Sequence, residues 1–246
     1  MNELAALLTR EELRERLLAV GEARYHHRHP FHLRMHEGTL TRGQMQAWAL
    51  NRYYYQSRIP MKDALVLAKA DDPAFRRAWR KRILDHDGDT DGYGGIEKWI
   101  QLAEASGVPR ETVIPCHGVL PGVRYAVDAY LALVRDSSLL VAVASSLTEM
   151  FSRNLISLRM DRMREHYPYL VPGLAYFEGR LTQAPEDAQF ALGYVSDHAE
   201  SRAEQEQVIA ALEQKCAILW AQLDAIDYAY VSPGNIPPGC FVPDEE

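Results

Sequence analysis

Cysteine is scarce in this chain of 246 residues. Its three cysteines, Cys116, Cys216 and Cys240, lie far apart and form no C-x-x-C pair. This spacing gives neither a disulfide framework nor a thiolate zinc signature, and it suits a reducing compartment such as the cytoplasm.

Basic residues and long hydrophobic runs are also lacking. The 27 lysines and arginines are outnumbered by 34 acidic residues, which gives a formal charge of −7 and argues against nucleic acid or an anionic membrane as the main partner. No apolar run approaches a membrane span, and the N-terminus is too short and too acidic for a signal peptide. We therefore expect a cytoplasmic protein that works without membrane or nucleic acid.

Strand patterns and internal repeats are absent, whereas helical patterns are frequent. A capping box at Thr9 predicts a first helix ending at about Ala23, and residues 137–167 predict one long, nearly unbroken helix. A further long pattern covers 186–230, with an interruption near His198. The sequence therefore predicts a single all-α domain, 1–246, of about seven helices, in which about 232–246 form an irregular, proline-rich tail.

The stretch 51–62, N-R-Y-Y-Y-Q-S-R-I-P-M-K, combines adjacent tyrosines with cations. On a helix, Arg52 and Gln56 share a face, and Pro60 should break the helix and redirect Lys62. One interpretation is a half-buried pocket wall for a planar, anionic ligand. The other is a packing helix whose cations extend to solvent, and the stretch by itself slightly favours this second interpretation.

Other charged groups also interrupt apolar patterns. Together with Arg52 and Lys62, the cations Arg159, Arg180 and Lys215 lie on tyrosine-rich or apolar faces, as binding a small polycarboxylate would require. Glu149 lies in an apolar run and would be costly there unless paired.

Two histidine-containing segments are candidates for proton transfer or metal binding. His86 lies between two aspartates and, with Tyr176, could move protons, although a surface turn explains the local pattern better. The histidine-rich segment 25–36 defines no metal site, because no regularly spaced carboxylates join it.

A family resemblance joins these motifs. The matching blocks are Y-H-x-x-H-P (25–30), N-R-Y-Y-Y-Q-x-x-I-P-x-K (51–62), R-I-L-D-H-D-G (82–88), L-P-G-V-R-Y-A-V-D-A-Y (120–130), S-S-L-T-E (145–149) and K-x-x-I-L-W-x-x-L-D-A (215–225). This order resembles the pyrroloquinoline-quinone synthases over nearly the whole chain. The resemblance implies a homodimeric, haem-oxygenase-like or TenA-like bundle of seven helices. It also implies ring closure and multi-electron O2 oxidation of a bicyclic amino-polycarboxylate, with H2O2 released and neither a metal nor a redox cofactor used.

The resemblance also implies roles for individual residues. His86 would be a general acid/base, and Tyr176 and Arg180 would flank the oxygen site. Arg52, Lys62, Arg159 and Lys215 would hold carboxylates. The remaining substrate-binding positions would be Tyr25, His26, Tyr55, Gln56, Tyr130 and Glu149.

One position departs from the family pattern. Ile156 stands where the family has an oxygen-site histidine, and isoleucine can neither donate a hydrogen bond nor take a proton. A diverged paralogue, or a binding protein without oxygen chemistry, is therefore an alternative. A haem-oxygenase-like di-iron oxidase is a weaker one, because the late helix offers only Asp197 and His198 as ligands. A thiaminase-type cysteine nucleophile is weaker still, since Cys216 falls among core residues.

Overall fold

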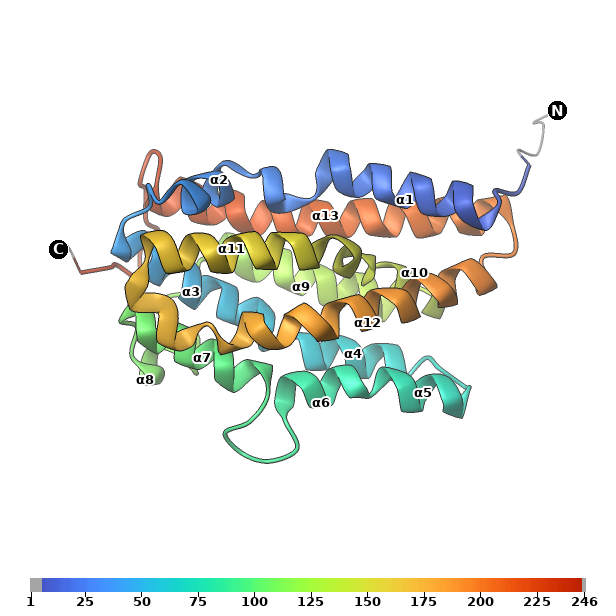
Figure 1. Cartoon of the computed structure of the whole chain (residues 1–246), viewed down its shortest axis with the longest axis horizontal. Helices are drawn as coiled ribbons and strands as arrows, with labels where there is room; N and C mark the ends of the chain where they lie inside the picture. Colours follow the sequence, from blue (N-terminus) through green and yellow to red (C-terminus); the bar gives the residue numbers. More distant parts are fainter. Residues whose placement is uncertain (1–5, 245–246) are drawn as a thin grey trace.

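The computed structural model describes residues 6–244, and within that range the chain forms helices and no strands (Figure 1). The α-helices are α1 (Arg10–Arg24), α2 (Pro30–Glu37), α3 (Arg42–Gln56), α4 (Ile59–Leu67), α5 (Pro73–Trp79), α6 (Lys81–Asp87), α7 (Gly95–Ser106), α8 (Arg110–Val113), α9 (Pro121–Asp136), α10 (Leu139–Ala144), α11 (Ser152–His166), α12 (Ala175–His198) and α13 (Arg202–Tyr230). Three short 3₁₀ helices join them: η1 (His26–Arg28), η2 (Leu147–Phe151) and η3 (Pro168–Gly173). The predicted all-α bundle is confirmed.

Helix starts follow the local sequence. The capping box at Thr9 opens α1, and a second capping box at Thr41 opens α3. In each, the threonine hydroxyl accepts from a backbone N–H that would otherwise lack a partner, while the side chain three residues later accepts from the cap backbone. Pro30, Pro73 and Pro121 occupy first turns, where a missing N–H costs nothing.

The bundle contains more helices than the predicted seven because several long segments are divided. The break before Pro60 is confirmed, since α3 ends at Gln56 and α4 begins at Ile59. The interruption near His198 is also confirmed, between α12 and α13.

The unbroken helix predicted over 137–167 is wrong. The hydroxyl of Ser145 donates to the carbonyl of Ala142 at 2.7 Å and competes there with the helical ladder. Helix α10 ends at this point, and the chain passes through η2 before α11 begins.

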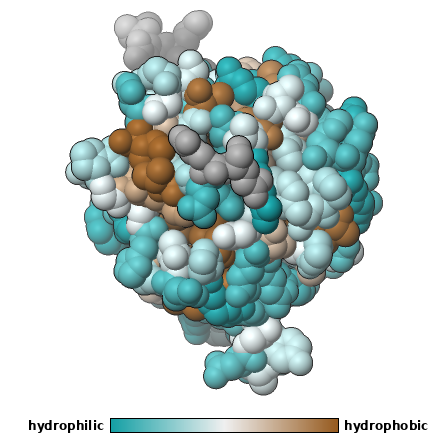
Figure 2. Space-filling view, turned by 90° about the vertical axis from the view of Figure 1, so that its left-hand side faces the viewer, coloured by the Kyte–Doolittle hydropathy of each residue, from teal (hydrophilic) through white to brown (hydrophobic). Residues whose placement is uncertain are grey.

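The segment Leu139–His166 is long and apolar enough to cross a membrane by composition. In the described bundle this segment is divided into α10, η2 and α11, and 56% of its apolar window is buried, as in helices that pack into a protein core. Figure 2 views the end of the bundle that carries α2 and α8, and its surface is mostly hydrophilic with separate hydrophobic patches.

Helix α13 lies along α1 at one edge of the bundle, and α5 and α6 lie at the opposite edge (Figure 1). At Gly173, the chain approaches α7 so closely that an added Cβ would lie 2.5 Å from the Cα of Leu102. The irregular tail folds back on the bundle, where the N–H of Phe241 donates to the carbonyl of Gly118 at 2.9 Å. The elements between these edges enclose the candidate site.

Candidate active site

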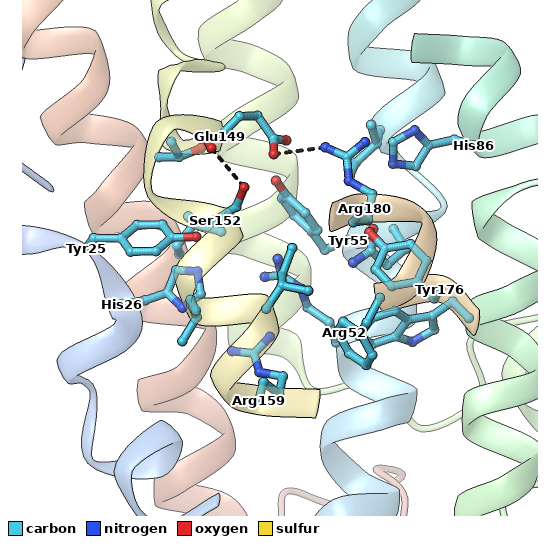
Figure 3. Close-up of a pocket in the computed structure, with 18 residues that line it drawn as sticks. Tyr25, His26, Arg52, Tyr55, His86, Glu149, Ser152, Arg159, Tyr176 and Arg180 are labelled. Atoms are coloured by element: carbon cyan, nitrogen blue, oxygen red, sulfur yellow. Dashed lines mark hydrogen bonds and ion pairs between the residues drawn. The ribbon is translucent and has the colours of Figure 1, made fainter. Parts of the chain in front are cut away.

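A cavity lies inside the bundle between η1, α3, α6, η2, α11 and α12 (Figure 3). Most of the predicted site residues line it: Tyr25, His26, Arg52, Tyr55, Gln56, His86, Glu149, Arg159, Tyr176 and Arg180. These residues are up to 155 positions apart in the chain (25 to 180), so the fold, and not local sequence, brings them together.

Three predicted residues, Lys62, Tyr130 and Lys215, lie behind the cavity wall. The Nζ of Lys215 donates to the hydroxyl of Tyr55 at 2.8 Å and lies 3.2 Å from the ring centroid of Tyr130. Burial and the neighbouring Arg52 lower the pKa of Lys215 well below its usual value. Lys62 is paired with Asp63, and its Nζ lies 3.3 Å from the hydroxyl of Ser146. Lys215 thus contacts a cavity-lining side chain, Tyr55, whereas Lys62 contacts Asp63 and Ser146 behind the wall.

A buried ion-pair network supports one side of the cavity. The guanidinium of Arg180 pairs with Glu149 at 2.9 Å and with Asp187 at 3.3 Å (Figure 3). Arg82 pairs with Asp187 at 3.1 Å and with Asp63 at 3.3 Å. Burial alone would raise the pKa of Glu149, but the guanidiniums of Arg180 and Arg82 outweigh it and lower the pKa to about 2. The predicted need of Glu149 for a partner is thus met.

Two arginines in the cavity have no such compensation. Among residues 6–244, neither Arg52 nor Arg159 forms an ion pair with a carboxylate. Arg52 donates to Gln222 at 3.3 Å and lies 4.0 Å from the ring centroid of Tyr55. The buried Nε of Arg159 has no hydrogen-bond partner within the described range, and burial lowers the pKa of this guanidinium to about 10. The cavity therefore carries uncompensated positive charge, which an anionic ligand would neutralise.

His86 is buried, with 3% of its surface exposed, so the surface turn that its local sequence favoured is wrong. Its Nδ1 lies 2.9 Å from the carbonyl of Arg82 and must donate to it, because a carbonyl only accepts. Burial, with Arg180 nearby, lowers the pKa of His86 to about 4, so the ring is neutral at pH 7 and its Nε2 can accept a hydrogen bond. Figure 3 shows His86 beside Arg180.

Tyr176 completes this side of the cavity. Its hydroxyl donates to Oε1 of Gln56 at 2.9 Å, and its ring packs edge-on against Trp99. Burial raises the pKa of Tyr176, so its hydroxyl stays protonated; with its single proton directed to Gln56, it offers a lone pair to a ligand.

The cavity also contains residues that sequence reasoning missed. Trp99, Thr148, Ser152, Leu155, Phe177 and Leu219 line it. Their positions match ordinary helix patterns, so nothing in the sequence distinguished them. The acidic partners Asp63 and Asp187 were also missed, although Asp63 interrupts an apolar run and could have been found in that way.

Metal ligation finds no support in the described part of the chain. No three histidine, cysteine or acidic side chains within residues 6–244 are grouped so that they could hold a metal ion. Asp197, one of the two candidate di-iron ligands, instead forms a surface ion pair with Arg10.

Known proteins are similar to this chain over nearly its whole length. The model of the TENA/THI-4/PQQC family matches residues 15–225. A pyrroloquinoline-quinone synthase of Xanthomonas campestris pv. campestris is 54% identical over 244 residues, covering 99% of this chain and 98% of the relative. One of Gluconobacter oxydans is 52% identical over 238 residues, covering 96% and 99%.

Solved structures support the fold at low sequence identity. A domain from Shewanella denitrificans with a heme oxygenase-like fold superposes with a TM-score of 0.75 at 13% identity, covering 96% of this chain and 100% of that one. A TenA homologue from P. horikoshii gives a TM-score of 0.67 at 14% identity, covering 89% and 98%. Since full-length relatives exceed half identity, the chain belongs to the TENA/THI-4/PQQC family and, within it, to the pyrroloquinoline-quinone synthases.

Proposed function

We propose that this enzyme of pyrroloquinoline quinone biosynthesis catalyses its final step. The substrate would be a bicyclic amino-polycarboxylate, which undergoes ring closure and multi-electron oxidation by O2. Each O2 that leaves as H2O2 takes two electrons and two protons from the substrate. The substrate's conjugated rings supply these electrons, so the proposal includes no metal and no redox cofactor.

The observation that carries the proposal is the uncompensated charge of Arg52 and Arg159 in a buried cavity. A guanidinium presents paired N–H donors that match a carboxylate, and such pairs are strong where water is excluded. The guanidinium of Arg52 lies over the ring of Tyr55, which helps to hold it in place for a ligand. A small polycarboxylate would supply the anionic groups that these two arginines lack.

Proton transfer is assigned to the opposite side of the cavity. His86, whose Nε2 carries no proton, would remove a proton from the substrate once the bound ligand has changed its surroundings, and Tyr176 and Arg180 would bind a reduced oxygen species. Ile156, which also lines the cavity, adds neither a donor nor an acceptor there. O2 reduction would depend on the other three groups. A homodimer in the cytoplasm is part of the same proposal.

The test is an aerobic single-turnover spectrum with the bicyclic precursor, recorded with O2 uptake and H2O2 release. The parent, Ile156→His and Leu158→His would be compared, because Leu158 lies on the same helix but is 44% exposed and serves as a matched control. We expect the parent and the control to convert the precursor to the quinone. A precursor spectrum unchanged under air in all three proteins would refute the proposal.

A second candidate is a binding protein that retains the cavity without the oxygen chemistry, and Ile156 is the observation that favours it. Tight binding of the precursor under air, without O2 uptake, would support this function. A stalled intermediate in the parent that the Ile156→His variant converts would instead show an enzyme with a slowed oxygen step.

A further inference from the structure

The histidine-rich segment 25–36 leads from the cavity toward the surface. His26 lines the cavity, whereas His32 lies behind it and is 2% exposed. The ring of His36 stacks on His32, with 6.2 Å between ring centroids, and is partly exposed. Such a row could relay protons to the surface, or it could hold the cavity histidine in one protonation state. The hydrogen bonds decide between these functions.

The position of the proton on His32 follows from the carbonyl of His26. Its Nδ1 lies 2.9 Å from that carbonyl oxygen, which can only accept a hydrogen bond, so Nδ1 of His32 must donate. Nη2 of Arg159 lies 3.1 Å from Nε2 and 3.4 Å from Nδ1 of the same ring, and it therefore does not distinguish the two nitrogens. A neutral His32 thus carries its proton on Nδ1.

The protonation of His32 then determines that of His26. The two Nδ1 atoms lie 3.0 Å apart, so only one of them can carry a proton in this contact. The proton in this contact is the one on Nδ1 of His32. Nδ1 of His26 therefore accepts a hydrogen bond, and the single proton of the neutral His26 ring is on Nε2. The reverse assignment would set a lone pair of His32 Nδ1 against the carbonyl oxygen of His26.

A second proton on either ring is disfavoured. Burial lowers the pKa of His26 well below its usual value, and Arg52 and Arg159 add to this effect. Burial and Arg159 do the same to His32. To pass a proton outward to His36, His32 would have to protonate Nε2 beside a guanidinium, so Arg159 opposes a relay.

We propose that His32 is a positioning residue that holds His26 in one tautomer, so that His26 presents an Nε2–H donor to an oxygen of the ligand in the cavity. His26 lines the cavity, and since its Nδ1 is directed toward His32, Nε2 is the ring nitrogen left to meet a ligand there. The matching ligand group is a carboxylate or carbonyl oxygen. The assignment of the tautomer stands without the proposed function, and only the identity of the ligand depends on it.

The first experiment reads the tautomers directly. The full chain, labelled with 15N in histidine and free of ligand, is studied at pH 7 by two-bond 1H–15N correlation spectroscopy, with signals assigned by single substitutions. We expect His26 to carry its proton on Nε2 and His32 to carry its proton on Nδ1. A bare Nε2 on His26 would overturn the proposal, whatever the substrate proves to be.

The second experiment separates a positioning function from a purely structural one. His32→Phe keeps a ring but removes the donor, whereas the amide N–H of His32→Asn can stand in for Nδ1–H. We expect His32→Phe to give mixed tautomers of His26 and roughly tenfold weaker binding of pyrroloquinoline quinone, which is about the effect of losing one hydrogen bond to a charged group. His32→Asn should restore both properties.

His36→Phe is the matched control. It keeps the ring stacked on His32, and the structure gives His36 Nε2 no hydrogen-bond partner among residues 6–244. We expect this variant to leave the His26 tautomer and the affinity unchanged. An unchanged His26 tautomer in His32→Phe would overturn the proposal. If His32→Phe does not fold, the spectrum of the parent and that of His32→Asn still decide the question. Failure of pyrroloquinoline quinone to bind the parent would count against the proposed function and not against the tautomer.

Discussion

Replacing Arg159 by methionine should stabilise the unliganded protein and weaken ligand binding. Burial lowers the pKa of Arg159 from 12.5 to about 10, which corresponds to about 3 kcal/mol of unfavourable free energy for the charged form. The Arg159→Met variant loses the contact of the guanidinium with His32 and its cation–π contact with Trp48, which together stabilise the parent by about 2 kcal/mol. The expected net gain in unfolding free energy is about 1 kcal/mol, or roughly 2–4 °C in Tm for a chain of this size.

The destabilisation by buried, charged Arg159 depends on pH. Because the folded state holds the guanidinium proton of Arg159 less tightly than the unfolded chain does, the unfavourable free energy is fully present below pH 10 and disappears only at strongly alkaline pH, where the unfolded chain also loses the proton. Thermal and urea unfolding at pH 7 therefore measure the whole effect. Calorimetric titration with pyrroloquinoline quinone should show roughly 10- to 100-fold weaker binding, as expected for a lost hydrogen bond to a carboxylate.

Arg82→Met is the matched control for this prediction. Arg82 is also buried, but it pairs with Asp63 and Asp187, so its loss leaves buried carboxylates without a partner. The same chemical change should here destabilise the protein by about 3–5 kcal/mol. If Arg159→Met were destabilised to a similar extent while ligand affinity stayed unchanged, the inference of an uncompensated cation in the cavity would be refuted.

Three further predictions concern other parts of the bundle. The pKa of Glu149 is lowered from 4.5 to about 2, which should contribute about 3 kcal/mol of stability above pH 4.5 that is lost as the pH falls toward 2. Urea midpoints should therefore fall less steeply with falling pH in Glu149→Gln than in the parent. Equal slopes in the two proteins would contradict this prediction. Gly173→Ala should destabilise the fold by roughly 1–3 kcal/mol in urea unfolding, because its Cβ would meet the backbone of Leu102. Gly193→Ala, whose Cβ would meet open space, should instead raise the unfolding free energy by about 0.5–1 kcal/mol. Similar effects of the two substitutions would argue against the close approach of Gly173 to α7. Tyr176→Phe should lower kcat by roughly 10²-fold in O2-uptake assays. The unfolding free energy should change by only about 1 kcal/mol, the effect of losing the hydrogen bond to Gln56. An unchanged kcat would show that Tyr176 takes no part in the proton-transfer steps.

Much of the fold was predictable because its signals are local. The caps at Thr9 and Thr41 and the break at Pro60 depend on a few neighbouring residues, so the sequence contains the whole argument. The exception was the long helix over 137–167. Apolar periodicity shows that such a segment is buried, but it does not show that Ser145 will bond to its own backbone.

The candidate site was predictable as a set of residue types and not as a geometry. A cation in an apolar pattern must find a partner or a ligand, and for that reason Arg52, Arg159 and Arg180 were recognised from sequence. Which of these cations is paired depends on side chains that only the packed bundle brings close. Tertiary structure gave Arg180 its carboxylates, left Arg159 without one and buried His86, because these outcomes depend on contacts between residues far apart in the chain.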